Sequence, residues 1–270
     1  GGGDGYDGSA GIGSGSHSTG YTHITLHDGV TVKATGGGNS SLGGGGGAGI
    51  GSGNRAKGNT DILIKGATKV TAKGGSTAAG IGSGNGSNGS TIINIEGGTI
   101  TAEGGGKENG SCQASGAGIG SGGNALNKTT INIKGGEITA TGGVSLDSRN
   151  HSDKWLSGAG IGSGSYSGSK PNNQKGAVTI NITDGTIEKA TGGGEYVPSS
   201  KRWYSGAGIG AGLNAGTTTI NIKDNAHIVS ATGGKYGGAG IGSGSGDTKN
   251  DSKKGAVTIN ITDGTIEKAT

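Results

Sequence analysis

A glycine-rich motif recurs seven times along the chain and constrains its fold more than any other feature. In its fullest form the motif reads Ala-Gly-Ile-Gly-Ser-Gly, at residues 159–164. Its isoleucines are Ile12, Ile50, Ile81, Ile119, Ile161, Ile209 and Ile241. Successive copies lie 31 to 48 residues apart. A fixed order of short elements at such a period is typical of a solenoid, in which each repeat stacks on its neighbours.

A second recurring piece alternates apolar and polar residues, as in residues 130–133, Thr-Ile-Asn-Ile. Alternation with a period of two predicts a β-strand that has one buried face. We therefore expect isoleucines such as Ile182, together with Ile161 of the motif, to be nearly fully buried. The outward positions are Thr25, Leu63, Asn94, Asn132, Asn181, Asn221 and Asn260. Asparagines stacked one coil apart could form a hydrogen-bonded ladder that stiffens the rod.

Pairs of small or acidic residues follow these strands, as at 97–98 and 184–185, and predict tight turns with a positive φ. A second strand comes next, for example residues 138–140, Ile-Thr-Ala. In residues 187–190, Ile-Glu-Lys-Ala, one extra residue separates the two buried positions, which predicts a β-bulge. With the motif, this makes three short strands per coil. The pattern predicts an all-β fold, a right-handed parallel β-helix (a solenoid) of about seven coils.

The composition agrees with a narrow core. Only 27% of the residues are hydrophobic and there is no Phe, which is too little for a thick globular core in a chain of 270 residues. Glycine accounts for 70 residues, but no Gly-X-Y period exists, so collagen is excluded. We expect residues 1–270 to form a single β-helix repeat domain. Residues 175–191 and 254–270 are identical and no polar cap is evident, so we expect the chain to be a window of a longer array.

Other function classes lack their sequence signals. The net charge is +4, from 22 basic and 18 acidic residues that form no basic run, so no nucleic-acid partner is expected. No apolar run approaches the roughly 18 residues of a membrane helix, so no membrane insertion is expected. The outward charges do not repeat as a catalytic set, and the five histidines show no metal-ligand spacing. We therefore expect no enzyme activity, no metal and no cofactor.

The motif, the Thr-Ile-Asn-Ile strand and the Gly-Thr-Ile-Thr-Ala segment together resemble the glycine-rich β-helix repeats of large secreted surface proteins from Gram-positive anaerobic bacteria. The pattern is similar, more loosely, to clostridial carbohydrate-binding β-helix proteins, in which Gly-Asp-Gly-Ile-Asp stands in place of Gly-Ala-Gly-Ile-Gly. The resemblance covers every coil and implies secretion and contact with glycans. The aspartates of those proteins could hold calcium. Ala and Gly occupy the matching positions here, so the resemblance implies no metal site.

Two long insertions, residues 144–157 and 194–205, provide the candidate ligand-binding site. Their ends read Lys-Trp-Leu-Ser and Arg-Trp-Tyr-Ser, and each Trp lies six residues before the isoleucine of the next motif. The candidate residues are Lys154, Trp155, Arg202, Trp203 and Tyr204, with Tyr166 and Tyr196 nearby. Aromatic rings on a loop suit stacking on sugars, and the basic groups beside them could hold a carboxylate or a sulfate. The alternative is that both indoles only pin their loops onto the rod.

These features predict a structural and adhesive protein, a stiff spacer that is secreted or attached to a cell surface. Its loops would contact a glycan or the surface of a host or neighbouring cell, and the rod could self-associate end to end or laterally. Two alternatives stay open. A flat face of Thr and Asn is what an ice-binding protein requires, and here that face is interrupted by Leu63, Glu96, Lys134 and Lys223. A parallel β-helix can also carry the active site of a polysaccharide-degrading enzyme.

Overall fold

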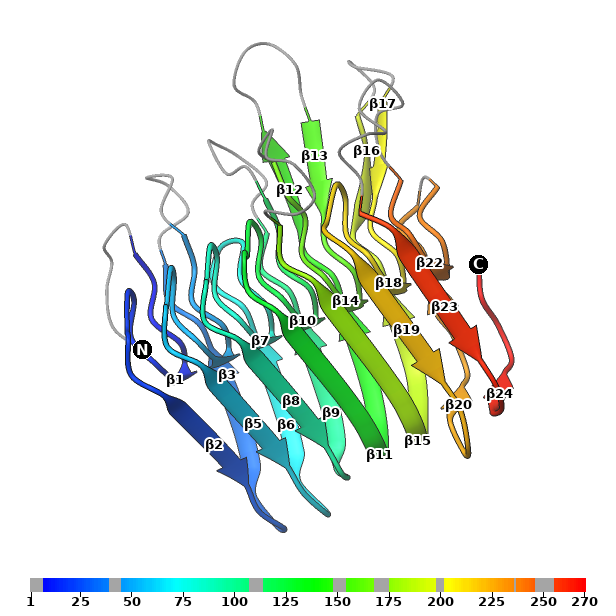
Figure 1. The fold of residues 1–270 in the computed structure, drawn as a ribbon, viewed down its shortest axis with the longest axis horizontal. Helices are drawn as coiled ribbons and strands as arrows, with labels where there is room; N and C mark the ends of the chain where they lie inside the picture. The colour runs from blue at the N-terminus through cyan, green and yellow to red at the C-terminus, as the bar shows by residue number, and fades with distance from the viewer. Residues whose placement is uncertain are drawn as a thin grey trace.

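The chain folds as a parallel β-helix, which confirms the predicted fold class. The computed structural model describes residues 7–38, 45–106, 114–147, 154–167, 175–197, 202–235, 237–245 and 255–270. The coils stack along the long axis of the molecule, and the two ends of the chain lie at opposite ends of the stack (Figure 1).

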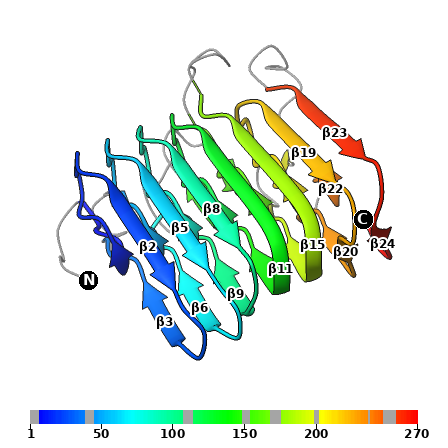
Figure 2. The ribbon, with the colours of Figure 1, turned by 60° about the horizontal axis from the view of Figure 1, so that its bottom comes forward.

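Each coil offers up to three strand positions, and each strand pairs with its counterpart in the next coil. The motif forms two-residue strands in a seven-stranded parallel sheet: β1 (Ile12–Gly13), β4 (Ile50–Gly51), β7 (Ile81–Gly82), β10 (Ile119–Gly120), β14 (Ile161–Gly162), β18 (Ile209–Gly210) and β22 (Ile241–Gly242). The alternating strands are β2 (Thr22–Leu26), β5 (Thr60–Ile64), β8 (Thr91–Ile95), β11 (Thr129–Thr141), β15 (Val178–Thr191), β19 (Thr218–Ile222) and β23 (Val257–Ile261). The remaining second strands are β3 (Thr31–Thr35), β6 (Lys69–Lys73), β9 (Thr99–Glu103), β20 (His227–Ile228), β21 (Ala231–Thr232) and β24 (Thr265–Ile266). Figure 2 shows the alternating strands as one row, with the second strands in a row beside it.

The bends between the alternating and second strands have the conformation that the sequence predicts. Gly98, Gly136 and Gly185 have φ values of 94°, 93° and 85°. In β11 and β15, however, pairing between the two coils continues on both sides of the bend. Each therefore forms one long strand where two were expected, because the pairing also includes the bend itself, where Lys134 pairs with Asp184.

The β-bulge expected in the fifth coil is present. Ile138 of β11 pairs with Ile187 of β15, but the next residue, Thr139, pairs with Lys189. Glu188 is thus the extra residue, and the two strands regain the same inward register after it, where alanine pairs with alanine.

The core is a narrow column of isoleucine, valine and alanine. Ile161 and Ile182 are both 0% exposed, as the sequence predicts. Their counterparts throughout the inner coils are equally buried and form one continuous cluster. In the last coil, Ile259 and Ile261 are 42% and 52% exposed, because no further coil of the described chain covers them. Stacking of coils, and not the single coil, therefore buries the core.

In the first five copies of the motif, the serine links its coil to the next. The serine Oγ accepts a hydrogen bond from a backbone N–H in the next coil. The donor is the last glycine of the next copy of the motif. The pairs are Ser14–Gly53, Ser52–Gly84, Ser83–Gly122, Ser121–Gly164 and Ser163–Gly212, with distances of 2.9–3.1 Å. The serine therefore satisfies a backbone donor at a point where the chain turns, and without it that donor would be buried and unpaired.

A buried hydroxyl in this column offers a first test of the packing. Thr218 of β19 is fully buried, its hydroxyl has no hydrogen-bond partner among the described residues, and its register neighbours are Val178 and Val257. An unpaired buried hydroxyl costs about 1–3 kcal/mol. Thr218→Val should therefore raise the free energy of unfolding by about 1 kcal/mol, measured by chemical denaturation. Thr129→Val is the control, because that hydroxyl accepts a hydrogen bond from Asn127 and its loss should bring no gain. Equal gains in both variants would contradict this account.

Candidate functional site

The two long insertions form β-hairpins that project from the same side of the rod (Figure 1). β12 (Val144–Asp147) pairs antiparallel with β13 (Lys154–Ser157), and β16 (Gly194–Val197) pairs antiparallel with β17 (Arg202–Ser205). The same bond closes both hairpins, since Gly158 N donates to Gly143 O and Gly206 N donates to Gly193 O. Strand β13 lies against β16 and β17. The hairpins are therefore neighbours that project from equivalent corners of consecutive coils.

The backbone brings the two tryptophans to matching positions on these hairpins. Trp155 pairs with Leu146 across the first hairpin, and Trp203 pairs with Tyr196 across the second. The side chains of Lys154, Trp155, Arg202 and Trp203 lie outside the described part of the structure. A ligand platform made by these four side chains thus stays a prediction.

Tyr204 requires a correction. Its side chain is only 3% exposed and packs with Leu156 of the first hairpin and with Leu213, which follows β18, in a small apolar cluster. A ring in this position holds the hairpins against the rod and is not accessible to a ligand. Tyr166 is also buried, at 7% exposure, and the Lys175 ammonium lies 5.3 Å from its ring centroid. Burial raises the pKa of Tyr166.

The outward asparagines form the ladder that the sequence predicts. Each Nδ2 donates to Oδ1 of the asparagine one coil earlier. The pairs are Asn132–Asn94, Asn181–Asn132, Asn221–Asn181 and Asn260–Asn221, at 2.8–2.9 Å. Beside the ladder, two residues earlier in each strand, run Thr130, Thr179, Thr219 and Thr258. Asn181, Asn221 and Asn260 also line an open hollow of about 480 Å³, together with Thr183 and Lys223.

We expect the ladder to contribute modestly to stability, and more at a residue that makes two ladder hydrogen bonds than at one that makes a single bond. Asn181→Ala removes two half-buried side-chain hydrogen bonds and should lower the free energy of unfolding by about 1–2 kcal/mol. Asn260→Ala is the matched control, because it removes one such bond on an exposed residue and should cost about half as much. Denaturation of both variants measures the difference. Indistinguishable values near zero would show that the ladder does not stabilise the rod.

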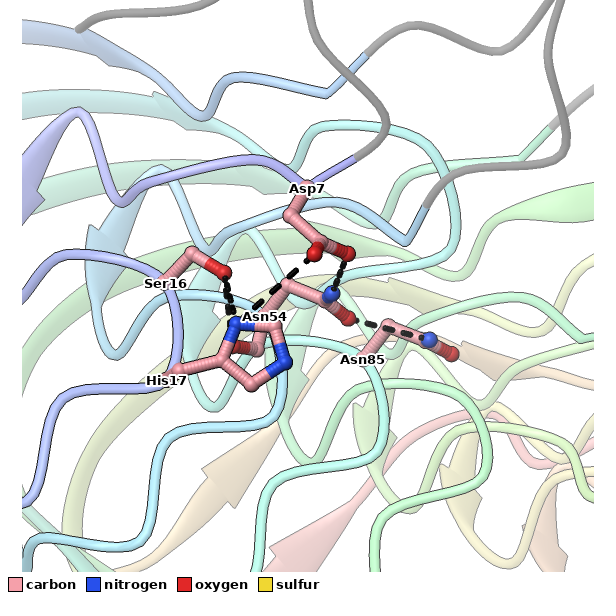
Figure 3. A network of polar contacts seen from close by, with 5 residues as sticks. All are labelled: Asp7, Ser16, His17, Asn54 and Asn85. Atoms are coloured by element: carbon pink, nitrogen blue, oxygen red, sulfur yellow. Dashed lines mark hydrogen bonds and ion pairs between the residues drawn. The ribbon is translucent and has the colours of Figure 1, made fainter.

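A polar cluster in the first coils has the composition of a catalytic triad but not its geometry (Figure 3). Ser16 Oγ lies 2.8 Å from Nδ1 of His17, and Oδ2 of Asp7 lies 3.7 Å from that same nitrogen. A Ser-His-Asp relay requires the hydroxyl and the carboxylate at opposite nitrogens of the ring. Asp7 instead accepts a hydrogen bond from the amide of Asn54, whose oxygen accepts one from Asn85. The cluster therefore ties neighbouring coils together, and it offers no observation that favours an enzyme.

The described ranges lack two further kinds of feature. Within them, no group of three or more His, Cys, Asp or Glu side chains is placed to hold a metal ion. Nor does any helix in those ranges have the length and apolar character needed to cross a bilayer.

A family model described as a beta helix repeat matches residues 62–85, 93–123, 131–165 and 180–213. Each match begins at the first buried isoleucine of an alternating strand and continues past the next copy of the motif. Comparisons with curated proteins and with solved structures found no match. The geometry and the family model agree, and the chain is a parallel β-helix that contains a region of β-helix repeats.

Proposed function

We propose that the protein is a structural and adhesive surface protein, secreted or attached to a cell, whose β-helix is a stiff spacer that presents glycan-binding hairpins. One observation carries the proposal. The only two tryptophans of the chain occupy matching register positions on two hairpins that lie side by side and project from the rod.

The rod has the properties that a spacer needs. Parallel pairing links every coil to the next, and the serine and asparagine hydrogen bonds add cross-links on two further rows. A continuous buried column runs through the stack. Bending such a rod would break hydrogen bonds in several rows at once, which favours a rigid element over a flexible linker.

The hairpins have the placement that a contact surface needs. Equivalent positions on adjacent coils are about 4.8 Å apart, a spacing that projecting loops can widen toward the separation of neighbouring sugar rings. Tryptophan stacks well on the apolar faces of sugars, and the basic residues Lys154 and Arg202 beside the two indoles favour acidic glycans. The proposal therefore predicts selectivity for uronate or sulfate groups.

Glycan-array binding tests the adhesive function. The wild-type protein should bind acidic glycans, and Trp155→Ala and Trp203→Ala should each weaken that binding at least about tenfold, because each removes a stacking surface near the centre of the contact. Val30→Ala is the control, an exposed apolar residue on the first coil whose loss should change nothing. An array on which no acidic glycan binds, or on which both Trp variants bind as the wild type does, would refute the proposed contact.

Ice binding is the second candidate, favoured by the Thr-x-Asn pairs that repeat without interruption on β11, β15, β19 and β23. Thermal hysteresis measures it directly. The asparagine side chains already hydrogen-bond to one another along the rod. We therefore prefer the interpretation that this face stabilises the rod over the interpretation that it binds ice.

A further inference from the structure

We propose that the outer face of the first two coils carries a second binding site, built around Tyr21 and selective for neutral sugars. Tyr21 directly precedes β2 and is 63% exposed, the highest value among the large exposed hydrophobic residues that the structure describes. His23, two residues later, lies on the same side of the strand. The two ring centroids are 6.4 Å apart and the ring planes differ by 17°. The rings are stacked on each other, and the large exposed fraction of Tyr21 leaves part of the pair available for a sugar to stack on.

The ring pair is held in place before any ligand arrives. The Tyr21 hydroxyl donates a hydrogen bond to Oδ2 of Asp61 on β5, in the next coil. That bond raises the pKa of Tyr21 above the ordinary value of a phenol. The hydroxyl is protonated at neutral pH in either case, so it is a donor to Asp61 there. Nε2 of His23 lies 3.1 Å from the hydroxyl of Thr25. Side chains that are already ordered lose less conformational entropy on binding.

Asp61 decides the class of ligand. Among the described residues, no hydrogen bond uses the second oxygen of this carboxylate. Ile92, the register partner of Asp61 in the third coil, is 40% exposed. A charged acceptor therefore lies between an aromatic and an aliphatic surface. A sugar matches this arrangement, because it offers hydroxyl donors along its edge and C–H groups on its face. An acidic sugar is disfavoured, because its carboxylate would lie close to that of Asp61.

The Tyr21 site and the hairpins are separate. Tyr21, His23 and Asp61 belong to the first two coils, whereas the hairpins precede β14 and β18. No residue is common to both sites, and the expected charge preferences are opposite. The neutral-sugar site can therefore be present when the hairpins bind nothing, and the hairpins can bind a glycan when the Tyr21 site does not.

Calorimetric titration of the whole chain tests the inference. The probes are neutral hexasaccharides and uronate hexasaccharides of the same linkage, with β-1,4-mannohexaose and hexamannuronate as one pair. The wild type should bind at least one neutral member more tightly than its acidic partner. Tyr21→Ala should weaken that binding about fivefold or more, and Tyr21→Phe, which keeps the ring but loses the anchoring hydroxyl, should weaken it less. Asp61→Asn should reduce the preference for the neutral member.

Circular dichroism checks that the variants fold, which is expected because Tyr21 is exposed. The double variant Trp155→Ala, Trp203→Ala should keep neutral-sugar binding. The inference is overturned if the wild type binds no neutral hexasaccharide or if Tyr21→Ala binds as the wild type does. It is equally overturned if the double tryptophan variant, and not Tyr21→Ala, loses the neutral sugar.

Discussion

Replacing Gly120 with alanine is expected to lower the free energy of unfolding by roughly 3–5 kcal/mol, because backbone strain and a steric clash with the next coil add to each other. Gly120 is the second glycine of the motif and has a φ of 137°, a conformation that L side chains rarely adopt. A Cβ at this position would lie 1.8 Å from the carbonyl oxygen of Gly162 in the next coil. That oxygen belongs to the stacked backbone, so relieving the clash requires the two coils to separate.

The matched control is Gly20→Ala. Gly20 is exposed, its φ is outside the left-handed region, and nothing lies within 4 Å of the place that an alanine Cβ would take. Alanine there should be neutral or slightly stabilising, because it restricts the unfolded chain. Urea denaturation of both variants measures the contrast, and a Gly120→Ala variant as stable as Gly20→Ala would show that the coils do not approach as closely as described.

Ile93→Ala is the second large effect, with an expected loss of roughly 2–5 kcal/mol. Ile93 is 0% exposed in the column, and truncation leaves a cavity that the stacked coils above and below hold open. The same strand supplies a control of identical chemistry, since Ile92 is 40% exposed on the outer face. Ile92→Ala should cost less than about 1 kcal/mol. Comparable losses in the two variants would mean that the inward register is wrong.

Features that repeat were predictable from the sequence. The alternation in each coil identifies Ile161 and Ile182 as core residues, because the same apolar face must be buried every time. The asparagine ladder follows from the same register, since equal residues at equal strand positions come one coil apart. The bulge at Glu188 was visible because a single extra residue breaks an otherwise constant spacing.

Features that occur once were not predictable. Tyr204 and Trp203 look alike in sequence as aromatic residues on an insertion. Only the packing of Tyr204 on Leu156 and Leu213, which come from other coils, shows that it is buried. Tyr21 and Asp61 are 40 residues apart in the sequence. The residue types at their two positions differ from coil to coil, so no repeating pattern predicts the contact between them. Local periodicity therefore determines the rod, whereas side-chain contacts between coils determine the sites.

The most direct test of the adhesive role removes both hairpins and keeps the rod. Just before the third copy of the motif, Ser76 and Thr77 alone connect Gly75 to Ala78, and Ala78 N donates to Gly75 O as Gly158 N does to Gly143 O at the base of the first hairpin. Replacing residues 144–157 and 194–205 each by Ser-Thr should therefore give a chain that still folds, as judged by circular dichroism. Binding of this variant to acidic glycans, compared with the wild type, is the measurement that matters. The account predicts that the wild type binds and that the variant does not; acidic-glycan binding that survives the replacement would contradict it.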